Sequence, residues 1–321
     1  MRIVVALGGN ALLRRGEKPD AEIQLVHVRA AARALAPIAA QHELIICHGN
    51  GPQVGMLALE SENDTVLTRS YPLDALVAQT QGMIGYWLAQ SLRNEGVTRP
   101  VISLVTQTLV ASDDPEFDAP TKFVGPGYDL ELAHDLAGRH GWTIAADGEK
   151  WRRVVPSPEP RHIVEQDSIT RLLASGRVVI CGGGGGAPVT EDGEGRLRGV
   201  EAVVDKDAVS ALLAINIQAD RLLVLTDVPA VMAHFGTPQA APLPHLDLAE
   251  LADLHFPAGS MGPKIAACRR FVTATGQPAA IGALTDAAAV LAGTAGTTIT
   301  ARPEHERTTA SSSARSAAPP R

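Results

Sequence analysis

Four glycine-rich segments of this sequence could bind an anion through bare backbone. Five consecutive glycines, residues 182–186, follow a short apolar run at 178–181. Glycines also follow the apolar runs at 3–7 and 43–47, and a fourth glycine segment covers residues 259–262. Loops of this kind present N–H groups that bind phosphate. Because so many glycines are entropically costly in a folded domain, we expect the backbone at 182–186 to approach another group closely, with a flexible spacer as the alternative.

Three lysines and two aspartates could act beside these glycines. Asp205, Lys206 and Asp207 lie at a predicted strand-to-helix junction, and Lys264 follows the fourth glycine segment. A carboxylate at the start of a helix is often a plain cap, but it can also orient lysines that neutralise a transferring phosphate. Lys122 precedes a Gly-Pro turn, where a solvated lysine is the default interpretation and a lid over the site is the alternative.

Motifs for several other chemistries are absent. No segment matches GxxxxGK[ST], the protein-kinase HRD and DFG patterns or GxSxG. The five glycines run into Pro188 and an acidic turn at 191–195 rather than into a helix, so a nicotinamide oxidoreductase is a remote alternative. His48 could be a general base, although a histidine at a strand end more often makes a structural hydrogen bond.

The elements that must position these residues alternate between strand and helix. Glycines follow several predicted strands, and ligands of open parallel sheets lie off the carboxyl ends of the strands, so the glycine segments should meet at one site. Pro37 should end or kink the first helix. We predict strands at 3–7, 43–47, 100–105, 178–181, 221–228, 279–284 and 297–301, and helices at 20–40, 73–88, 168–175 and from about 207 to 216.

Residues 111–161 differ in character from the rest of the chain. They are rich in proline, glycine, aspartate and charge. A structureless loop of this length would be unusual in a compact domain, so we expect a small inserted subdomain, folded partly as hairpins, over the mouth of the site. The serine- and proline-rich tail, residues 302–321, is predicted to be disordered.

Composition excludes some classes of protein. The chain has 321 residues, 45% of them hydrophobic and 20% charged, with a net charge of −7. This balance argues against a general nucleic-acid binder, and no stretch could span a bilayer. The cysteines, Cys47, Cys181 and Cys268, are odd in number and lack zinc-site spacing, so we expect free thiols and a cytoplasmic protein.

The order of these motifs resembles carbamate kinase, of the amino acid kinase superfamily, over about residues 1–301. In the first half the resemblance is carried by Ala6-Leu7-Gly8-Gly9-Asn10-Ala11-Leu12, His48-Gly49-Asn50-Gly51-Pro52-Gln53-Val54-Gly55 and Gln81-Gly82-Met83-Ile84-Gly85-Tyr86-Trp87. In the second half it is carried by the segments 151–158, 181–188, 200–207 and 259–264.

The resemblance implies a fold, a reaction and an assembly. The fold is α/β, a three-layer αβα sandwich around a mostly parallel sheet, with a small inserted protruding subdomain. The reaction is reversible phosphoryl transfer between ATP and carbamate with Mg²⁺ carried by the nucleotide, usually running from carbamoyl phosphate and ADP toward ATP at the end of arginine breakdown. The resemblance also implies a homodimer and no metal ligands from the protein itself.

The same resemblance implies the roles of individual residues. The acceptor and the transferring phosphate are held by Gly8, Gly9, Asn10, Gly49 and Asn50, in a cleft also lined by Gly182, Gly183 and Gly184. Asp207 orients the lysines, Lys206 and Lys264 neutralise the phosphates, and Lys122 closes on the site from the inserted subdomain. The nucleotide is expected near Asp227, Val228, Val231, Met232, Met261 and Gly262.

One departure from the superfamily concerns charge. Many relatives have a lysine just before the first Gly-Gly, where this chain has Leu7. A lysine on the lid could supply the missing charge, which favours a catalytic role for Lys122.

Two classes of alternative stay open. One is another small-acceptor kinase of the superfamily, acting on an amino acid, a nucleoside monophosphate or a phosphonate; the absence of an appended regulatory domain disfavours aspartate kinase. The other is a catalytically inactive sensor on the same fold, which the presence of Lys206, Asp207 and Lys264 disfavours.

Overall fold

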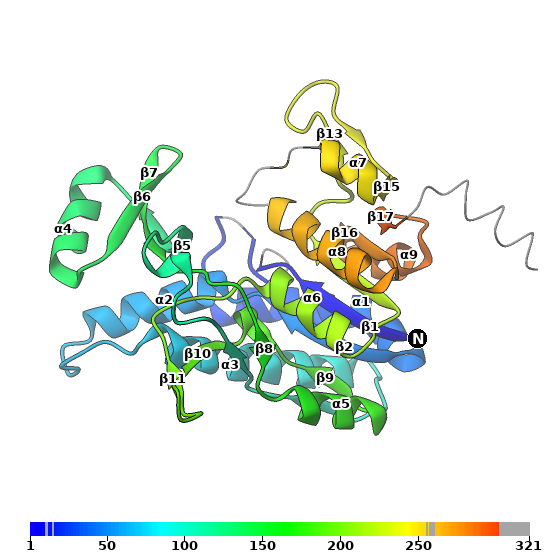
Figure 1. Cartoon of the computed structure of the whole chain (residues 1–321), viewed down its shortest axis with the longest axis horizontal. Coiled ribbons are helices and arrows are strands. Elements are labelled where there is room, and N and C mark those ends of the chain that lie inside the picture. The colour runs from blue at the N-terminus through cyan, green and yellow to red at the C-terminus, as the bar shows by residue number, and fades with distance from the viewer. Residues whose placement is uncertain (10–11, 15, 255, 257–260, 302–321) are drawn as a thin grey trace, which may run out of the picture.

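A mostly parallel sheet forms the centre of the molecule (Figure 1). The computed structural model describes residues 1–301 apart from 10, 11, 15, 255 and 257–260. Neighbouring strands of the eight-stranded sheet are parallel except for the β16–β17 pair. In spatial order the strands are β15 (His245–Asp247), β17 (Thr297–Thr300), β16 (Ala279–Ala283), β12 (Arg221–Thr226), β1 (Arg2–Leu7), β2 (Glu43–His48), β9 (Val178–Ile180) and β3 (Val101–Ser103).

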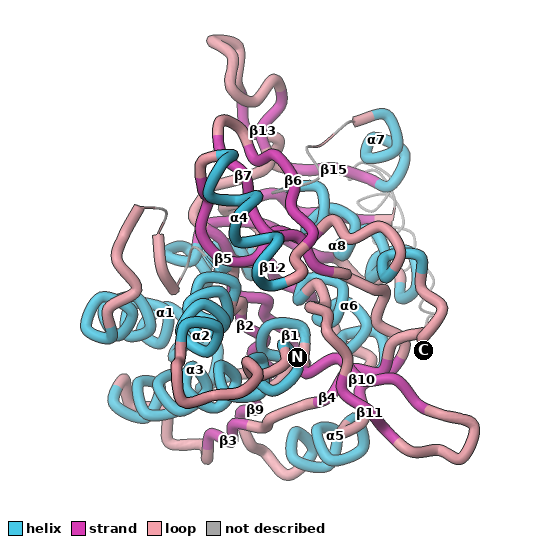
Figure 2. The backbone as a smooth tube through the Cα atoms, turned by 90° about the vertical axis from the view of Figure 1, so that its left-hand side faces the viewer, coloured by secondary structure: helices cyan, strands magenta, loops and turns pink. Residues whose placement is uncertain are grey.

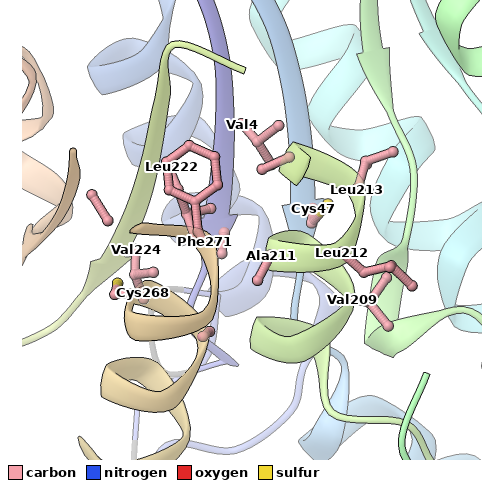
Figure 3. Packing of buried hydrophobic residues seen from close by; sticks show 14 of the residues in the cluster. Val4, Cys47, Val209, Ala211, Leu212, Leu213, Leu222, Val224, Cys268 and Phe271 are labelled. Atoms are coloured by element: carbon pink, nitrogen blue, oxygen red, sulfur yellow. The ribbon is translucent and has the colours of Figure 1, made fainter. Parts of the chain in front are cut away.

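Helices cover both faces of this sheet. One face packs against α1 (Ala21–Gln41), α3 (Leu73–Asn94) and α9 (Ala287–Ala292), and the other against α5 (Gln166–Ala174), α6 (Lys206–Asn216) and α8 (Met261–Thr275). Side chains of β1 alternate between the two cores, as a strand buried on both faces requires. Figure 3 shows Phe271 of α8 and Leu213 of α6 in one apolar cluster with Val4 and Leu222 of the central sheet. The predicted α/β fold with a mostly parallel sheet between helical layers is confirmed.

Smaller sheets flank the centre. A four-stranded sheet has the order β11 (Leu197–Gly199), β10 (Ala187–Glu191), β4 (Gln107–Leu109) and β8 (His162–Ile163), and β13 (Met232–Ala233) pairs with β14 (Ala241–Pro242). An antiparallel sheet of β5 (Lys122–Tyr128), β7 (Lys150–Val155) and β6 (Thr143–Asp147) carries α4 (Leu130–His140). The remaining helices are α2 (Gly51–Asn63), α7 (Leu248–Asp253) and short 3₁₀ turns at 115–117, 183–185 and 284–286.

The β5–β7–β6 sheet stands away from the central sheet and rests on α2 (Figures 1 and 2). Val124 and Val155 of this sheet share a separate apolar cluster with Val54 and Ala58 of α2. This arrangement places the first residue of β5, Lys122, next to the body of the molecule.

Two local details differ from expectation. The first helix was predicted at 20–40, with Pro37 ending or kinking it; it runs from Ala21 to Gln41 and does not end at Pro37. Proline cannot bond the carbonyl of Arg33, but both residues lie on the exposed side of α1, where water can reach that carbonyl. The segment 200–204 ahead of α6 is not a strand: Val203 and Val204 are buried by packing, outside any sheet.

The five-glycine loop, residues 182–186, is buried against other backbone and side chains. Four of its glycines have φ between +62° and +87°, which disfavours any residue with a Cβ. A Cβ at Gly184 would collide with the amide of Asn50, and one at Gly185 with the carbonyl oxygen of Val204. Close approach, rather than a flexible spacer, therefore explains these glycines.

His48 ends β2 beneath this loop. Its side chain is 1% exposed, and Nδ1 lies 3.0 Å from the carbonyl oxygen of Gly49, to which it donates. Burial lowers the pKa of His48 to about 4. The imidazole is therefore neutral at pH 7, and its Nδ1 bonds the backbone, as expected of a structural histidine.

We predict that Gly185→Ala lowers the free energy of unfolding by roughly 2–4 kcal/mol, because the new Cβ is strained by positive φ and meets rigid backbone. Urea unfolding measures the change. Gly193→Ala is the matched control, since a Cβ there has open space around it. A loss at Gly185 no larger than at Gly193 would contradict the close-packing explanation.

We also predict that His48 makes the protein less stable in mild acid. Its folded pKa of about 4 lies below its ordinary value of 6.5, so between these values the unfolded chain binds a proton that the folded chain does not. The free energy of unfolding contributed by His48 should fall by about 2 kcal/mol from pH 7 to pH 5. Urea unfolding at both pH values should show a smaller fall for His48→Gln. Equal falls in the two proteins would show that His48 titrates normally.

Candidate active site

The carboxylate of Asp207 lies between two ammonium groups. Asp207 is in the first turn of α6, with a side chain 3% exposed. Its Oδ1 is 2.7 Å from Nζ of Lys206, and its Oδ2 is 3.5 Å from Nζ of Lys264. Lys264 comes from α8, so one carboxylate fixes cations from two helices. These three side chains form the floor of the candidate site.

The charges of this floor stabilise one another. Burial alone would lower the pKa of Lys206, but the carboxylates of Asp207 and Asp205 outweigh burial and raise it above its ordinary value. Lys206 therefore remains an ammonium group although only 11% of its side chain is exposed. A buried cation that is already held in place needs no reorganisation during a reaction. It is therefore suited to stabilising negative charge that develops beside it.

Asp205 joins the floor to the β5–β7–β6 sheet. It caps α6, and its Oδ1 accepts hydrogen bonds from the N–H groups of Asp207 and Ala208 at 2.9 and 3.3 Å. Its Oδ2 accepts from Nζ of Lys122 at 2.7 Å. Burial would raise the pKa of Asp205, but Lys122 and Lys206 together hold it well below its usual range. Asp205 is therefore both a helix cap and the partner of the third lysine.

The first two glycine loops meet directly above Lys206. Strands β1 and β2 are parallel neighbours, so Gly8 and Gly49 leave the sheet at the same edge. A Cβ on Gly49 would lie 2.9 Å from the Cα and N atoms of Gly9 and 3.4 Å from Cε of Lys206. Gly8 is tied to the next strand by an N–H bond of 2.8 Å to the carbonyl of Leu225. Glycine is required at Gly49 because backbone and lysine fill the space.

A cleft of about 210 Å³ opens between the floor, the loops and the β5–β7–β6 sheet. Among the described residues, its lining includes no serine, threonine, cysteine or histidine. The predicted residues that line it are Gly9, Gly49, Asn50, Lys122, Gly184, Lys206, Asp207 and Lys264. It is further lined by Gly51, Pro52, Val54, Phe123, Val124, Val203, Val204, Asp205 and Pro263.

Other predicted residues lie behind the cleft or elsewhere. Gly8, Gly182 and Gly183 support the loops from behind and are not part of the lining. Asn10 is outside the described residues, as are Gly259 and Ser260 of the fourth glycine segment.

The residues predicted to bind nucleotide lie away from this lining. Val231 is fully buried in the core, with its N–H bonded to Oγ1 of Thr297 at 2.9 Å, and Met261 packs against the same core. Asp227 follows β12 and accepts a bond of 2.9 Å from the hydroxyl of Thr226. The cleft lining as described includes none of Asp227, Val228, Val231, Met232, Met261 and Gly262.

A polar network beneath the five-glycine loop was missed by sequence reasoning. The N–H of Gly182 donates to Oγ1 of Thr106 at 2.9 Å, and that hydroxyl donates to Oε1 of Gln81 at 3.0 Å. The hydroxyl of Thr108 donates to the carbonyl of Gly185 at 2.7 Å. No local pattern marks these side chains as partners of a loop more than seventy residues further along, because the contacts exist only in the folded chain.

The described part of the chain offers little for a protein-bound metal. Among these residues no group of three or more His, Cys, Asp or Glu side chains is placed to hold an ion. The thiols of Cys47, Cys181 and Cys268 are free and buried, as the sequence predicted. None of the described helices is long and apolar enough to cross a membrane.

Comparison with known proteins identifies the family of this chain. The model of the amino acid kinase family matches residues 1–283. Carbamate kinase from Rhizobium meliloti (strain 1021) is 51% identical over 93% of each chain, and carbamate kinase from Escherichia coli (strain K12) is 50% identical over 92% of this chain and 98% of its own. The solved structure of carbamate kinase from Giardia lamblia bound to AMP-PNP is 38% identical, with a TM-score of 0.85 over 94% of this chain and 98% of that chain.

These similarities extend over almost the whole chain, and the fold and the family resemblance agree with them. The chain therefore belongs to the amino acid kinase family and, within it, to the carbamate kinase group.

Proposed function

We propose that this protein catalyses reversible phosphoryl transfer between ATP and carbamate. The observation that carries the proposal is the Asp207 carboxylate, which holds Lys206 and Lys264 at the floor of a cleft that Lys122 approaches from the other side. Relatives named carbamate kinase at about half identity, and one such structure bound to AMP-PNP, support the choice of acceptor and nucleotide.

Phosphoryl transfer suits a cleft whose described lining supplies cations but no serine, threonine, cysteine or histidine to act as a nucleophile. The reaction needs the two substrates aligned and the charge of the transferring group neutralised, with little covalent participation by the protein. In our proposal the loops at Gly9 and Gly49 hold the transferring group from one side. Lys206 and Lys264 neutralise it from the floor, and Asp207 keeps both ammonium groups in position before the substrate arrives.

Lys122 has to change partner during the reaction. In this structure its ammonium bonds Asp205, whose other oxygen caps α6. An incoming phosphate competes for the same ammonium, and Lys122 is 40% exposed and therefore able to turn toward it. We propose that Lys122 stabilises the transferring group in the closed site, and that Asp205 holds the lysine between turnovers.

Magnesium is expected to enter with the nucleotide, where it would neutralise charge on the phosphates. Both oxygens of Asp207 already face ammonium groups, so we assign the ion to the phosphates rather than to this carboxylate. We place the adenine toward residues 227–232 and 261–262, by resemblance to the family.

The wider setting is also part of the proposal. We propose that residues 1–301 form one kinase domain, that residues 111–161 are its inserted lid, and that residues 302–321 are dispensable. We further propose that the enzyme is a cytoplasmic homodimer and that it makes ATP from carbamoyl phosphate during arginine catabolism.

We predict that the protein forms ATP rapidly from ADP and fresh carbamoyl phosphate with Mg²⁺, and that Lys264→Ala and Lys206→Ala each lower kcat on the order of 10²- to 10³-fold, the usual cost of removing one preorganised donor. Coupled detection of ATP measures the rates. Lys150→Ala is the control, because Lys150 pairs with Asp129 on the exposed side of the lid.

Comparing turnover with different phosphoryl acceptors at equal concentrations shows which results would contradict the proposed reaction. Strong turnover only with glutamate or UMP would overturn carbamate as the acceptor. Binding of ADP without transfer to any acceptor would indicate an inactive sensor.

We predict that Lys122→Ala lowers kcat by roughly tenfold or more while the Kd for ADP changes by less than about threefold, since the lysine acts on the transferring group. Turnover and calorimetric ADP binding on the same preparation separate the two effects. Near-normal turnover in this variant would remove Lys122 from the mechanism.

A further inference from the structure

Arg153 of β7 joins the lid to two separate parts of the body. Its Nη1 lies 2.8 Å from Oε1 of Glu62, and its Nη2 lies 2.9 Å from Oε1 of Glu201. The face of its guanidinium lies over the ring of Trp142, 5.3 Å from the centroid. The side chain of Arg153 is 13% exposed and that of Glu62 8%, so this ion pair is largely removed from water.

Both carboxylates belong to segments that lead to the cleft. Glu62 is near the end of α2, and the first residue of that helix, Gly51, lines the cleft. Glu201 precedes Asp205, the partner of Lys122, by four residues. Its second oxygen accepts a bond of 2.9 Å from the N–H of Leu73 at the start of α3. Arg153 therefore stands where the lid, α2 and the approach to α6 meet.

The same strand pair carries Lys122. In the antiparallel register of β5 and β7, Arg153 is opposite Val124 and Lys122 is opposite Val155. A strand advances about 3.3 Å per residue, so the start of the lysine side chain is only roughly 7 Å along the strand from the point that Arg153 fixes. A shift of β7 would be passed on directly to Lys122.

The apolar contacts under the lid do not fix its orientation by themselves. Val124 and Val155 pack on α2, and the backbones of Gly55 and Gly125 touch, with a Cβ on Gly55 only 2.8 Å from Gly125. Apolar contact is non-directional. A cavity of about 10 Å³, bordered by Glu62 and Arg153, remains between α2 and the strands. The hydrogen bonds from the Arg153 guanidinium to Glu62 and Glu201 are directional, so they can fix the orientation of the β5–β7–β6 sheet, which the apolar contacts cannot.

We propose that Arg153 is a positioning residue, whose fork to Glu62 and Glu201 orients the lid so that the ammonium of Lys122 reaches the transferring phosphate. The proposal rests on the proposed function, since it gives Arg153 its effect through Lys122. Arg153 is not part of the cleft lining and touches no reacting atom. A buried ion pair often adds little to the free energy of folding, and its better supported role is to specify one arrangement of the elements that it joins.

A double-mutant cycle tests this coupling. Arg153→Ala should lower kcat by about ten- to a hundredfold, the scale of a misplaced catalytic group, with a small effect on the KM for ADP. In a Lys122→Ala background the same substitution should change kcat less than about twofold, because the group it positions is gone. Arg153→Lys should give an intermediate kcat, since it keeps the charge but not the fork. Equal losses in both backgrounds would overturn the proposal.

A second readout is independent of activity. Acylation of lysines by an amine-reactive reagent, followed by mass spectrometry, reports how firmly Lys122 is held against Asp205, with Lys264 as internal reference. Arg153→Ala should raise the labelling rate of Lys122 severalfold. Glu62→Gln should do the same, and because it keeps the size of the side chain it serves as the test if Arg153→Ala folds poorly. Lys150→Ala, on the same strand, should leave the rate unchanged.

The two readouts distinguish failure of this proposal from failure of the proposed function. Increased labelling of Lys122 in an enzyme that makes no ATP from carbamoyl phosphate would leave Arg153 as the positioning residue and reject the reaction. Unchanged labelling in Arg153→Ala, in an active enzyme, would reject the role of Arg153 and keep the reaction.

Discussion

The arrangement of the active site depends on one buried carboxylate. Asp207 is almost fully enclosed and would be strongly destabilised alone, because an unpaired buried charge is costly. Lys206 and Lys264 compensate that charge, and in return the carboxylate keeps two ammonium groups close together in a confined space. The result is a fixed positive floor whose geometry is set before any substrate is present, which is the condition for electrostatic catalysis.

The rest of the fold brings backbone up to that floor. Strands β12, β1, β2 and β9 are consecutive parallel neighbours, so the loops after them open at one edge of the sheet. Gly49 allows its loop to touch both Gly9 and the stem of Lys206, and a Cβ at Gly183, Gly184, Gly185 or Gly186 would overlap neighbouring atoms. The β5–β7–β6 sheet borders the cleft from outside, with Lys122 on Asp205 at one end of β5 and Arg153 on Glu62 further along the sheet.

Features that depend on local pattern could be predicted from the sequence. Apolar runs that end in glycine gave the central strands and the edge where they meet, and the Asp-Lys-Asp segment gave the start of α6. Helix α1 was predicted at nearly its observed length, but the tolerance of Pro37 inside it depends on solvent exposure, which could not be read from sequence. The valines of 200–204 have strand propensity, but none of them pairs in a sheet, and packing alone buries Val203 and Val204.

Features that depend on distant partners could not be predicted. The pairing of Lys122 with Asp205 spans 83 residues, and that of Arg153 with Glu62 spans 91. In the sequence, each of these four residues looks like an ordinary charged residue on a solvated surface. The same holds for Gln81, Thr106 and Thr108, which reveal their role only when α3 and β4 lie beneath the glycine loop. Most residues of the cleft were recognisable because glycine segments and the Asp-Lys-Asp junction mark them in the sequence, whereas the residues that support the cleft carry no such mark.

The measurement that tests the central claim most directly is turnover by Asp207→Asn. This substitution keeps the size of the side chain and removes only the charge that organises the two lysines. The account predicts a folded protein that still binds ADP but loses kcat by on the order of 10²-fold or more, although both lysines remain. Turnover close to that of the unsubstituted enzyme would show that Lys206 and Lys264 are positioned without the carboxylate, and would contradict the account.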